Sequence, residues 1–193
     1  ILGGASKIGK SWLVLDLCVR VAKGEDMWGM KTAGGTTLYL CLEDTLRRVQ
    51  DRLNNITDDV PANVFFANAA STLAEGLCAQ IRRFVKDHPD TCLVVIDTFQ
   101  IIRDENKDTS YSKDYSDLRM LKEVADELDI AVLLVHHIRK QGDSDPLNKL
   151  SGTTGVAGAV DTVFILDRSN RNETCATLLC TGRDIEDRQL EIK

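Results

Sequence analysis

The first eleven residues contain the spacing that most clearly predicts chemistry. Gly4-Ala5-Ser6-Lys7-Ile8-Gly9-Lys10-Ser11 has the pattern G-x-x-x-x-G-K-S of a phosphate-binding P-loop. Glycines let the backbone turn sharply, so that successive N–H groups can approach phosphate oxygens. In this pattern Lys10 reaches the β- and γ-phosphates and the Ser11 hydroxyl binds Mg²⁺. The spacing therefore predicts a site for a nucleoside triphosphate and its magnesium ion.

The residues on either side of this motif provide the context that it requires. Residues 1–3 predict the end of a strand, and residues 12–22 have the apolar spacing of a helix. A helix that begins near Lys10 directs the positive end of its dipole towards the bound anion. We include Trp12, which follows directly, among the nucleotide-binding residues. Lys7 either adds charge near the phosphates or is a solvated lysine.

The rest of the chain alternates between predicted strands and predicted helices. Apolar runs of the kind found in buried parallel strands cover residues 36–42, 64–67, 92–96 and 131–135. Helical spacing covers residues 45–56, 73–85 and 115–128, and further strands are expected at 162–166, 174–181 and 189–192. The order predicts an α/β fold whose mostly parallel central sheet is flanked by helices, with a β-rich C-terminal extension. The length of 193 residues fits a single domain.

Polar side chains follow several of these predicted strands. Glu43 and Asp44 come after residues 36–42, Asp97 comes after residues 92–96, and His136 and His137 come after residues 131–135. In an open parallel sheet, ligands bind beyond the carboxyl ends of the strands. We therefore expect these side chains to accompany the P-loop at one edge of the sheet.

The carboxylates at this edge have distinct expected roles. Asp97, after four apolar residues, is typical of a Walker B aspartate that holds Mg²⁺, although such a residue can also be a simple turn residue. Thr98 follows it where a glutamate would supply a base, so we assign the general base to Glu43. Asp44 is the alternative base, but we expect it to be the N-cap of the next helix.

Together these segments resemble the RecA-like ATPases, and among them the RepA-type helicase ATPases of plasmids and phages. The likeness covers nearly the whole chain and rests on residues 4–11, 40–44, 95–98, 135–137 and 151–152. It implies a RecA-like P-loop NTPase fold with ATP as substrate and Mg²⁺ as cofactor. It also implies a ring, usually of six subunits, that acts on single-stranded DNA and has its active sites at subunit interfaces.

The resemblance also implies roles for single residues. One of the two histidines would sense the γ-phosphate; His137 matches that position better, whereas His136 could face the core. An arginine of one subunit would complete the site of its neighbour, and Arg183 is the best-placed candidate. Its alternative is an ion pair with Asp184 or Glu186.

Two further sets of cations are candidates for ligand contacts. Arg52 could stack on the adenine, in competition with Arg47 and Arg48. The polar loop of residues 139–149 follows the histidines, and its cations Arg139, Lys140 and Lys149 could contact phosphates of single-stranded DNA. The alternative is a solvated loop, because Asp143 and Asp145 offset much of its charge.

Composition limits the function classes. The net charge of −6 argues against a general nucleic-acid coat, and no run of eighteen apolar residues predicts a membrane helix. The six scattered cysteines, without a C-x-x-C pair, indicate a reducing cytoplasm. Because Ile1 falls inside an apparent strand, we expect a fragment with an incomplete N-terminal end.

Three other functions remain open at this stage. The first is a recombination or regulatory ATPase that does not unwind DNA. The second is a small-molecule kinase, although no dedicated lid segment is evident in the sequence. The third is a nucleotide-dependent binding module with negligible turnover, against which Glu43, Asp97 and Lys10 argue.

Overall fold

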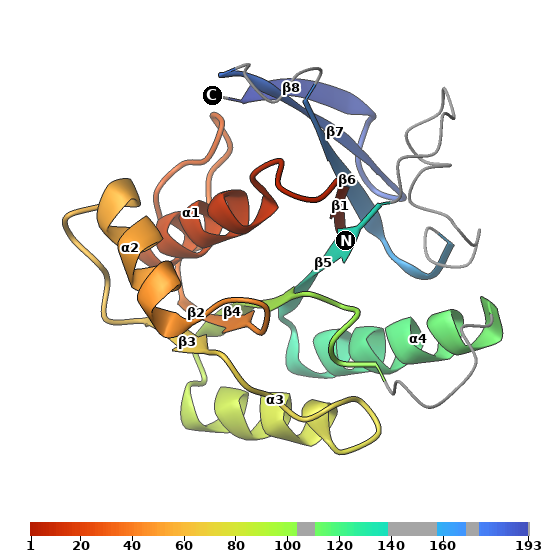
Figure 1. The fold of residues 1–193 in the computed structure, drawn as a ribbon. Coiled ribbons are helices and arrows are strands. Elements are labelled where there is room, and N and C mark those ends of the chain that lie inside the picture. Colours follow the sequence, from red (N-terminus) through yellow and green to blue (C-terminus); the bar gives the residue numbers. More distant parts are fainter. Residues whose placement is uncertain (104–110, 139–157, 169–173, 193) are drawn as a thin grey trace. The chain divides into compact units, whose positions relative to one another are not determined.

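A computed structural model describes residues 1–103, 111–138, 158–168 and 174–192 of the chain (Figure 1). Its elements are β1 (Leu2–Gly4), α1 (Lys10–Lys23), β2 (Thr36–Cys41), α2 (Leu46–Ile56), β3 (Val64–Ala67), α3 (Leu77–Asp87), β4 (Thr91–Asp97), α4 (Tyr111–Leu128), β5 (Ala131–His137), β6 (Thr162–Asp167), β7 (Ala176–Gly182) and β8 (Arg188–Ile192). The strands form one mixed sheet in the order β3-β2-β4-β5-β1-β6-β7-β8. The α/β class and the mostly parallel sheet expected from the sequence are confirmed.

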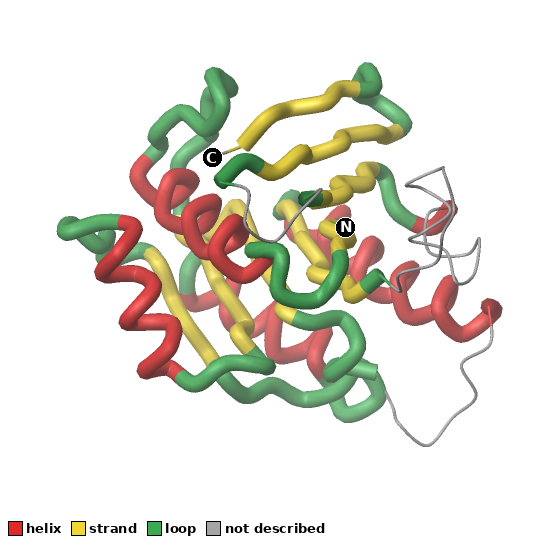
Figure 2. Tube along the Cα trace, turned by 45° about the horizontal axis from the view of Figure 1, so that its top comes forward, coloured by secondary structure: helices red, strands yellow, loops and turns green. Residues whose placement is uncertain are grey.

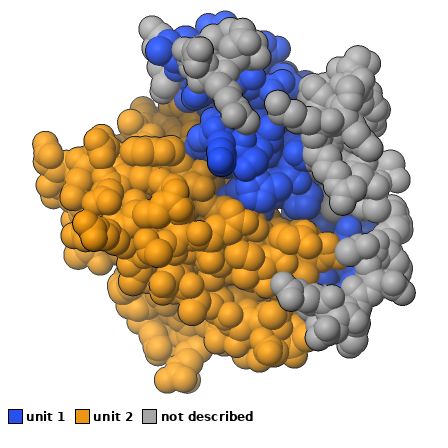
Figure 3. Space-filling view, viewed as in Figure 1, with its two compact units in different colours: residues 1–10, 106–119, 135–193 blue, residues 11–105, 120–134 orange. Residues whose placement is uncertain are grey.

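The chain divides into two compact units (Figure 3). Unit 1 contains residues 1–10, 106–119 and 135–193, and unit 2 contains residues 11–105 and 120–134. The P-loop up to Lys10 and the C-terminal strands belong to unit 1, whereas Ser11 and the strands β2, β3 and β4 belong to unit 2. The extent of the predicted single domain stays a prediction.

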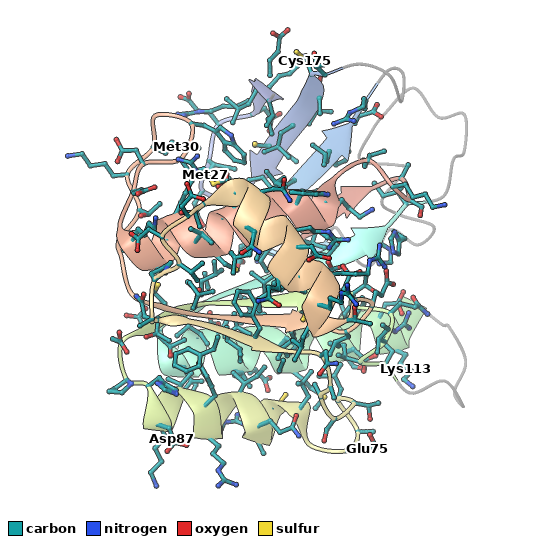
Figure 4. The ribbon with its side chains drawn as sticks, turned by 60° about the vertical axis from the view of Figure 1, so that its left-hand side comes forward. Met27, Met30, Glu75, Asp87, Lys113 and Cys175 are labelled. Carbon is teal, nitrogen blue, oxygen red and sulfur yellow. The ribbon has the colours of Figure 1, made fainter. Side chains whose placement is uncertain are left out.

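In unit 2, β2 lies between β3 and β4 and pairs with both in parallel. Every residue of β2 is buried, as the near-continuous apolar run predicts. Helices α1 and α2 cover one face of these strands, and α3 covers the other (Figures 1 and 4). The Thr37 hydroxyl donates a hydrogen bond of 3.3 Å to the Cys18 carbonyl, which ties β2 to α1. This packing fixes the carboxyl end of β2 beside that of β4, where Cys41 pairs with Asp97.

Two helix starts differ from those expected. Helix α3 begins at Leu77, four residues later than predicted, because Gly76 has a φ of 110° and interrupts the helical conformation. Helix α4 begins at Tyr111, four residues earlier than predicted. Leu73 is buried although it lies outside α3, which explains why its apolar character extended the predicted helix.

In unit 1, β1 pairs in parallel with the end of β5 on one side and with β6 on the other. Gly4 is opposite both His137 and Leu166 in these ladders. Strands β6, β7 and β8 form an antiparallel meander, which confirms the β-rich C-terminal part (Figure 2). No helix among the described residues is long and apolar enough to cross a membrane.

Candidate nucleotide- and metal-binding residues

The P-loop connects the end of β1 to the first residue of α1, as its sequence context predicts. Its backbone is left-handed at Lys7, with a φ of 65°, and at Gly9, with a φ of 109°. A Cβ atom on Gly4 would lie 2.8 Å from the Leu166 carbonyl oxygen, so a side chain there would collide with β6. Glycine is therefore required at Gly4 for close packing and favoured at Gly9 for its backbone conformation.

The side chain of Lys10 folds back onto the P-loop and contacts its backbone. Its side chain is buried, with 4% of the residue exposed, and Nζ donates hydrogen bonds of 2.8 Å to the carbonyl oxygens of Gly4 and Ala5. Its Nζ also lies 3.2 Å from Nδ1 of His137. That nitrogen can accept a hydrogen bond from the ammonium only when it carries no proton. In the neutral imidazole, this contact places the ring proton on Nε2.

The two histidines at the end of β5 have different surroundings. His137 is exposed and contacts the P-loop lysine, whereas His136 is half-buried. This difference agrees with the preference for His137 as the residue that responds to phosphate. The sensor role itself stays a prediction.

Asp97 ends β4 and is almost completely buried, with 3% of the residue exposed. Its Oδ2 accepts a hydrogen bond of 2.8 Å from the Tyr39 hydroxyl, and the Ser11 side chain lies beside it. Burial raises the pKa of Asp97 above its usual value, and the Ser11 and Tyr39 side chains, which favour the charged form, oppose that rise. Burial also raises the pKa of Tyr39, so its hydroxyl remains a donor at neutral pH.

Ser11 and Asp97 fit a magnesium ion that is shared with a nucleotide. Mg²⁺ prefers oxygen ligands and is commonly bound by one or two protein groups together with substrate phosphates and water. Ser11 and Asp97 therefore offer a hydroxyl and a carboxylate oxygen at neighbouring positions. The described part of the chain contains no cluster of three or more His, Cys, Asp or Glu that could enclose a metal. A site completed by phosphates and water matches this small set of ligands.

Glu43 lies just beyond β2 and is exposed, so water can reach its carboxylate. The Thr98 hydroxyl donates a hydrogen bond of 3.1 Å to its Oε1. Thr98 is fully buried, and the amide of Leu42 donates to the Asp97 carbonyl oxygen at 2.8 Å, which continues the pairing beyond the strands. Sequence reasoning missed this role of Thr98. The available signal was its place directly after Asp97 on the strand that neighbours β2.

The N-cap assigned to Asp44 is wrong. The cap of α2 is Thr45, whose side chain accepts from the amide of Arg48. The Asp44 side chain is instead largely removed from water, with 8% of it exposed, and forms ion pairs with Arg48 at 2.9 Å and with Arg52. Asp44 therefore belongs to an ion-pair cluster with two arginines of α2 and does not cap the backbone of that helix.

Arg52 and Trp12 lie together in unit 2. The Arg52 guanidinium is 5.9 Å from the centroid of the Trp12 ring, a cation–π distance, and only 15% of the Arg52 side chain is exposed. Trp12 is 45% exposed. Arg47 is exposed, and Arg48 pairs with Asp44. Stacking of Arg52 on adenine stays a prediction.

Arg183 follows β7 and has partners within its own unit. Its Nη2 donates a hydrogen bond of 2.8 Å to the Gly158 carbonyl oxygen, and its Nη1 lies 3.4 Å from Oδ1 of Asp161. The alternative ion pair with Asp184 or Glu186 is not formed, because the β6–β7 pairing brings Asp161 to this position. With 56% of its side chain exposed, Arg183 stays a candidate for contact with a neighbouring subunit.

Some candidates lie outside the described residues. These are Arg139, Lys140 and Lys149 of the expected DNA-binding loop, and residues 151–152 of the family resemblance. Their roles stay predictions.

Comparison with known proteins agrees with this geometry. A family model described as "AAA domain" matches residues 1–143. A solved structure described as an ATPase domain superimposes with a TM-score of 0.70 at 14% identity, over 98% of this chain and 78% of that one. None of the curated proteins matches the chain.

A second solved structure is that of a DnaB-like replicative helicase, described together with its interactions with primase. It superimposes with a TM-score of 0.72 at 14% identity. The match covers 98% of this chain and 53% of the helicase, so the chain spans about half the helicase's length. The fold is therefore the RecA-like fold of helicase ATPase domains, and family and fold together support an ATPase.

Proposed function

The chain belongs to the AAA domain family, and from this we propose that it hydrolyses ATP with Mg²⁺ as a RepA-like ring motor acting on single-stranded DNA. The buried carboxylate of Asp97, which ends β4 beside the Ser11 side chain, supports the nucleotide chemistry most directly. Ser11 ends the P-loop and Asp97 ends a buried strand, and a nucleotide-bound magnesium ion needs oxygen ligands from both. A chance P-loop sequence would give no reason for a buried carboxylate at its serine.

The proposed roles follow from the contacts of each residue. Lys10 binds the β- and γ-phosphates. Ser11 and Asp97 would hold Mg²⁺, which would neutralise charge on the phosphates when bound. Glu43, oriented by the hydroxyl of Thr98, accepts a proton from the attacking water. His137 responds to the γ-phosphate, and its contact with Lys10 supports this role.

The motor part of the proposal has separate support. One of the similar structures is a replicative helicase by its printed description, and the other is an ATPase domain. We propose a ring, of six subunits, in which Arg183 completes the site of the neighbouring subunit. Single-stranded DNA would be bound through Arg139, Lys140 and Lys149, and the protein would work in the cytoplasm.

The experiment is to measure ATP turnover with Mg²⁺ at several protein concentrations, with and without single-stranded DNA, together with the mass in solution. We expect turnover that increases with protein concentration and with DNA. Glu43→Gln should still bind ATP but hydrolyse it at least about a hundredfold more slowly, the lower range for a lost general base. Glu25→Gln, at an exposed position after α1, is the matched control and should turn over ATP like the parent chain.

The possible outcomes separate the alternatives. Unchanged turnover in Lys10→Ala would contradict the ATPase assignment altogether. Turnover by a monomer, without a response to DNA, would leave an ATPase but remove the motor. Transfer of the γ-phosphate to a small molecule in place of water would favour the kinase.

A further inference from the structure

A tyrosine in the core of unit 2 contacts the carboxylate that the proposed function gives to magnesium. Tyr39 lies in the middle of β2, and its hydroxyl donates a hydrogen bond of 2.8 Å to Oδ2 of Asp97. We propose that Tyr39 is a positioning residue, which holds the Asp97 carboxylate in the orientation that meets the Ser11 hydroxyl and the metal. This inference rests on the proposed function.

The register of the sheet explains how this contact arises. β2 and β4 pair in parallel with Cys41 opposite Asp97. Tyr39 is two residues before Cys41, so the side chains of Tyr39 and Cys41 project from the same face of the sheet. The side chain of Asp97, opposite Cys41, projects from that face too. The long side chain of Tyr39 can therefore extend along this face towards the carboxyl end of β4, where a shorter residue would stop below Asp97.

Packing fixes the position of the hydroxyl. Tyr39 is completely buried, and its ring meets that of Phe66 on β3 edge to face, with centroids 6.3 Å apart. A phenol has one hydrogen to donate, and a hydrogen bond to a carboxylate is stronger than one between neutral groups. Because the ring cannot move freely, the carboxylate must adjust to the hydroxyl.

Asp97 needs such a partner because its last torsion is intrinsically loose. The χ2 angle of aspartate has a broad distribution, so without a fixed partner the carboxylate plane is poorly defined. The Tyr39 hydroxyl on β2 supplies a fixed partner, and the Ser11 side chain on α1 lies beside the same carboxylate. A magnesium ion requires nearly ideal octahedral geometry and therefore depends on such definition.

The experiment uses Tyr39→Phe, which keeps the ring and its packing and removes only the hydroxyl. Thr37→Val is the matched control: it removes another fully buried hydroxyl from the same face of β2, one that donates to Cys18 and not to Asp97. Binding of ADP is measured by calorimetry while the Mg²⁺ concentration is varied, and thermal unfolding is measured beside it. We expect Tyr39→Phe to need at least about tenfold more Mg²⁺ for half-maximal binding, with unchanged binding in EDTA.

Three results would decide the matter. If Tyr39→Phe and Thr37→Val both keep the parent's Mg²⁺ dependence, Tyr39 is a core residue only, and the inference is overturned while the proposed function stands. If the parent chain binds ADP no better with Mg²⁺ than in EDTA, the proposed function itself fails. In an Asp97→Asn background, Tyr39→Phe should cause no further change in Mg²⁺ dependence. A change there equal to the one in the parent chain would also overturn the inference, whether or not Tyr39→Phe lowers the stability.

Discussion

The neighbouring ends of β2 and β4 each carry a buried carboxylate, and the two carboxylates have different hydrogen-bond and ion-pair partners. Asp44, beyond β2, is held by the guanidinium groups of Arg48 and Arg52. Asp97, at the end of β4, accepts a hydrogen bond from the Tyr39 hydroxyl and lies beside the Ser11 side chain. Both side chains are removed from water, so both must be stabilised by their surroundings.

The two kinds of partner have different consequences for a cation. Arginines neutralise the charge of Asp44 and make it part of a closed ion-pair cluster. Hydroxyls orient Asp97 but carry no formal charge, and burial raises its pKa. Because the Tyr39 and Ser11 hydroxyls leave the charge of the Asp97 carboxylate unneutralised, that charge can be stabilised by a bound divalent ion. The comparison therefore supports a structural role for Asp44 and the proposed metal role for Asp97.

The largest expected effect comes from Asp97→Asn, which keeps the shape of the side chain but removes its charge. ATP turnover should fall by about a thousandfold, roughly 4 kcal/mol, because charge stabilisation by the metal contributes several kcal/mol. Steady-state hydrolysis with saturating Mg²⁺ measures this loss. Turnover within about threefold of the parent would remove Asp97 from the metal site.

Asp97→Asn should be no less stable than the parent chain, and the pH dependence of unfolding tests this. Since the folded pKa of Asp97 is raised, the folded protein binds this proton more tightly than the unfolded chain does. Its contribution to the free energy of unfolding therefore becomes less favourable as the pH rises above the unfolded pKa of about 3.9. Without Mg²⁺, Asp97→Asn should unfold at an equal or higher urea concentration than the parent at pH 7. That difference should shrink as the pH is lowered towards 4.

The next largest effect should come from Asp44→Asn and should appear in stability. Loss of the charge leaves the mostly buried Arg52 without its carboxylate partner, at a cost of about 2 kcal/mol, within the range for hydrogen bonds between charged groups. Urea unfolding measures this loss, and turnover per folded molecule should change little. A greater loss of turnover than in Glu43→Gln would make Asp44 the base and reverse the comparison.

The sequence predicted where these side chains lie better than it predicted what holds them. Apolar runs mark buried strands, and this pattern located Glu43, Asp97 and His137 at strand ends. It could not distinguish the cap of α2, because Asp44 and Thr45 are adjacent and both residue types cap helices well. The choice depends on Arg48 and Arg52, which lie four and eight residues after Asp44, towards the same face of the helix.

The partners of the two site carboxylates were missed for a related reason. Tyr39 and Thr98 look like ordinary strand residues, since aromatic and β-branched residues are common in strands. Their contacts follow from the pairing of β2 with β4, and no local pattern in the sequence contains that register. Single residues that position a site through a neighbouring strand are therefore found only with the fold in hand.

The smallest effect that we predict concerns Thr98 and extends the comparison to the exposed carboxylate. The Thr98 hydroxyl donates to Oε1 of Glu43, so it should orient the proposed base without contacting substrate. Thr98→Val keeps the buried shape and should lower kcat by about tenfold, because one hydrogen bond to a charged group contributes roughly 1.5 kcal/mol. The KM for ATP should stay the same, since Glu43 acts on water.

Thr98→Ser, which restores the hydroxyl, should recover most of kcat. In a Glu43→Gln background Thr98→Val should cost much less, because the base that it orients is gone. An equal loss in both backgrounds would show that Thr98 supports the sheet edge and not Glu43.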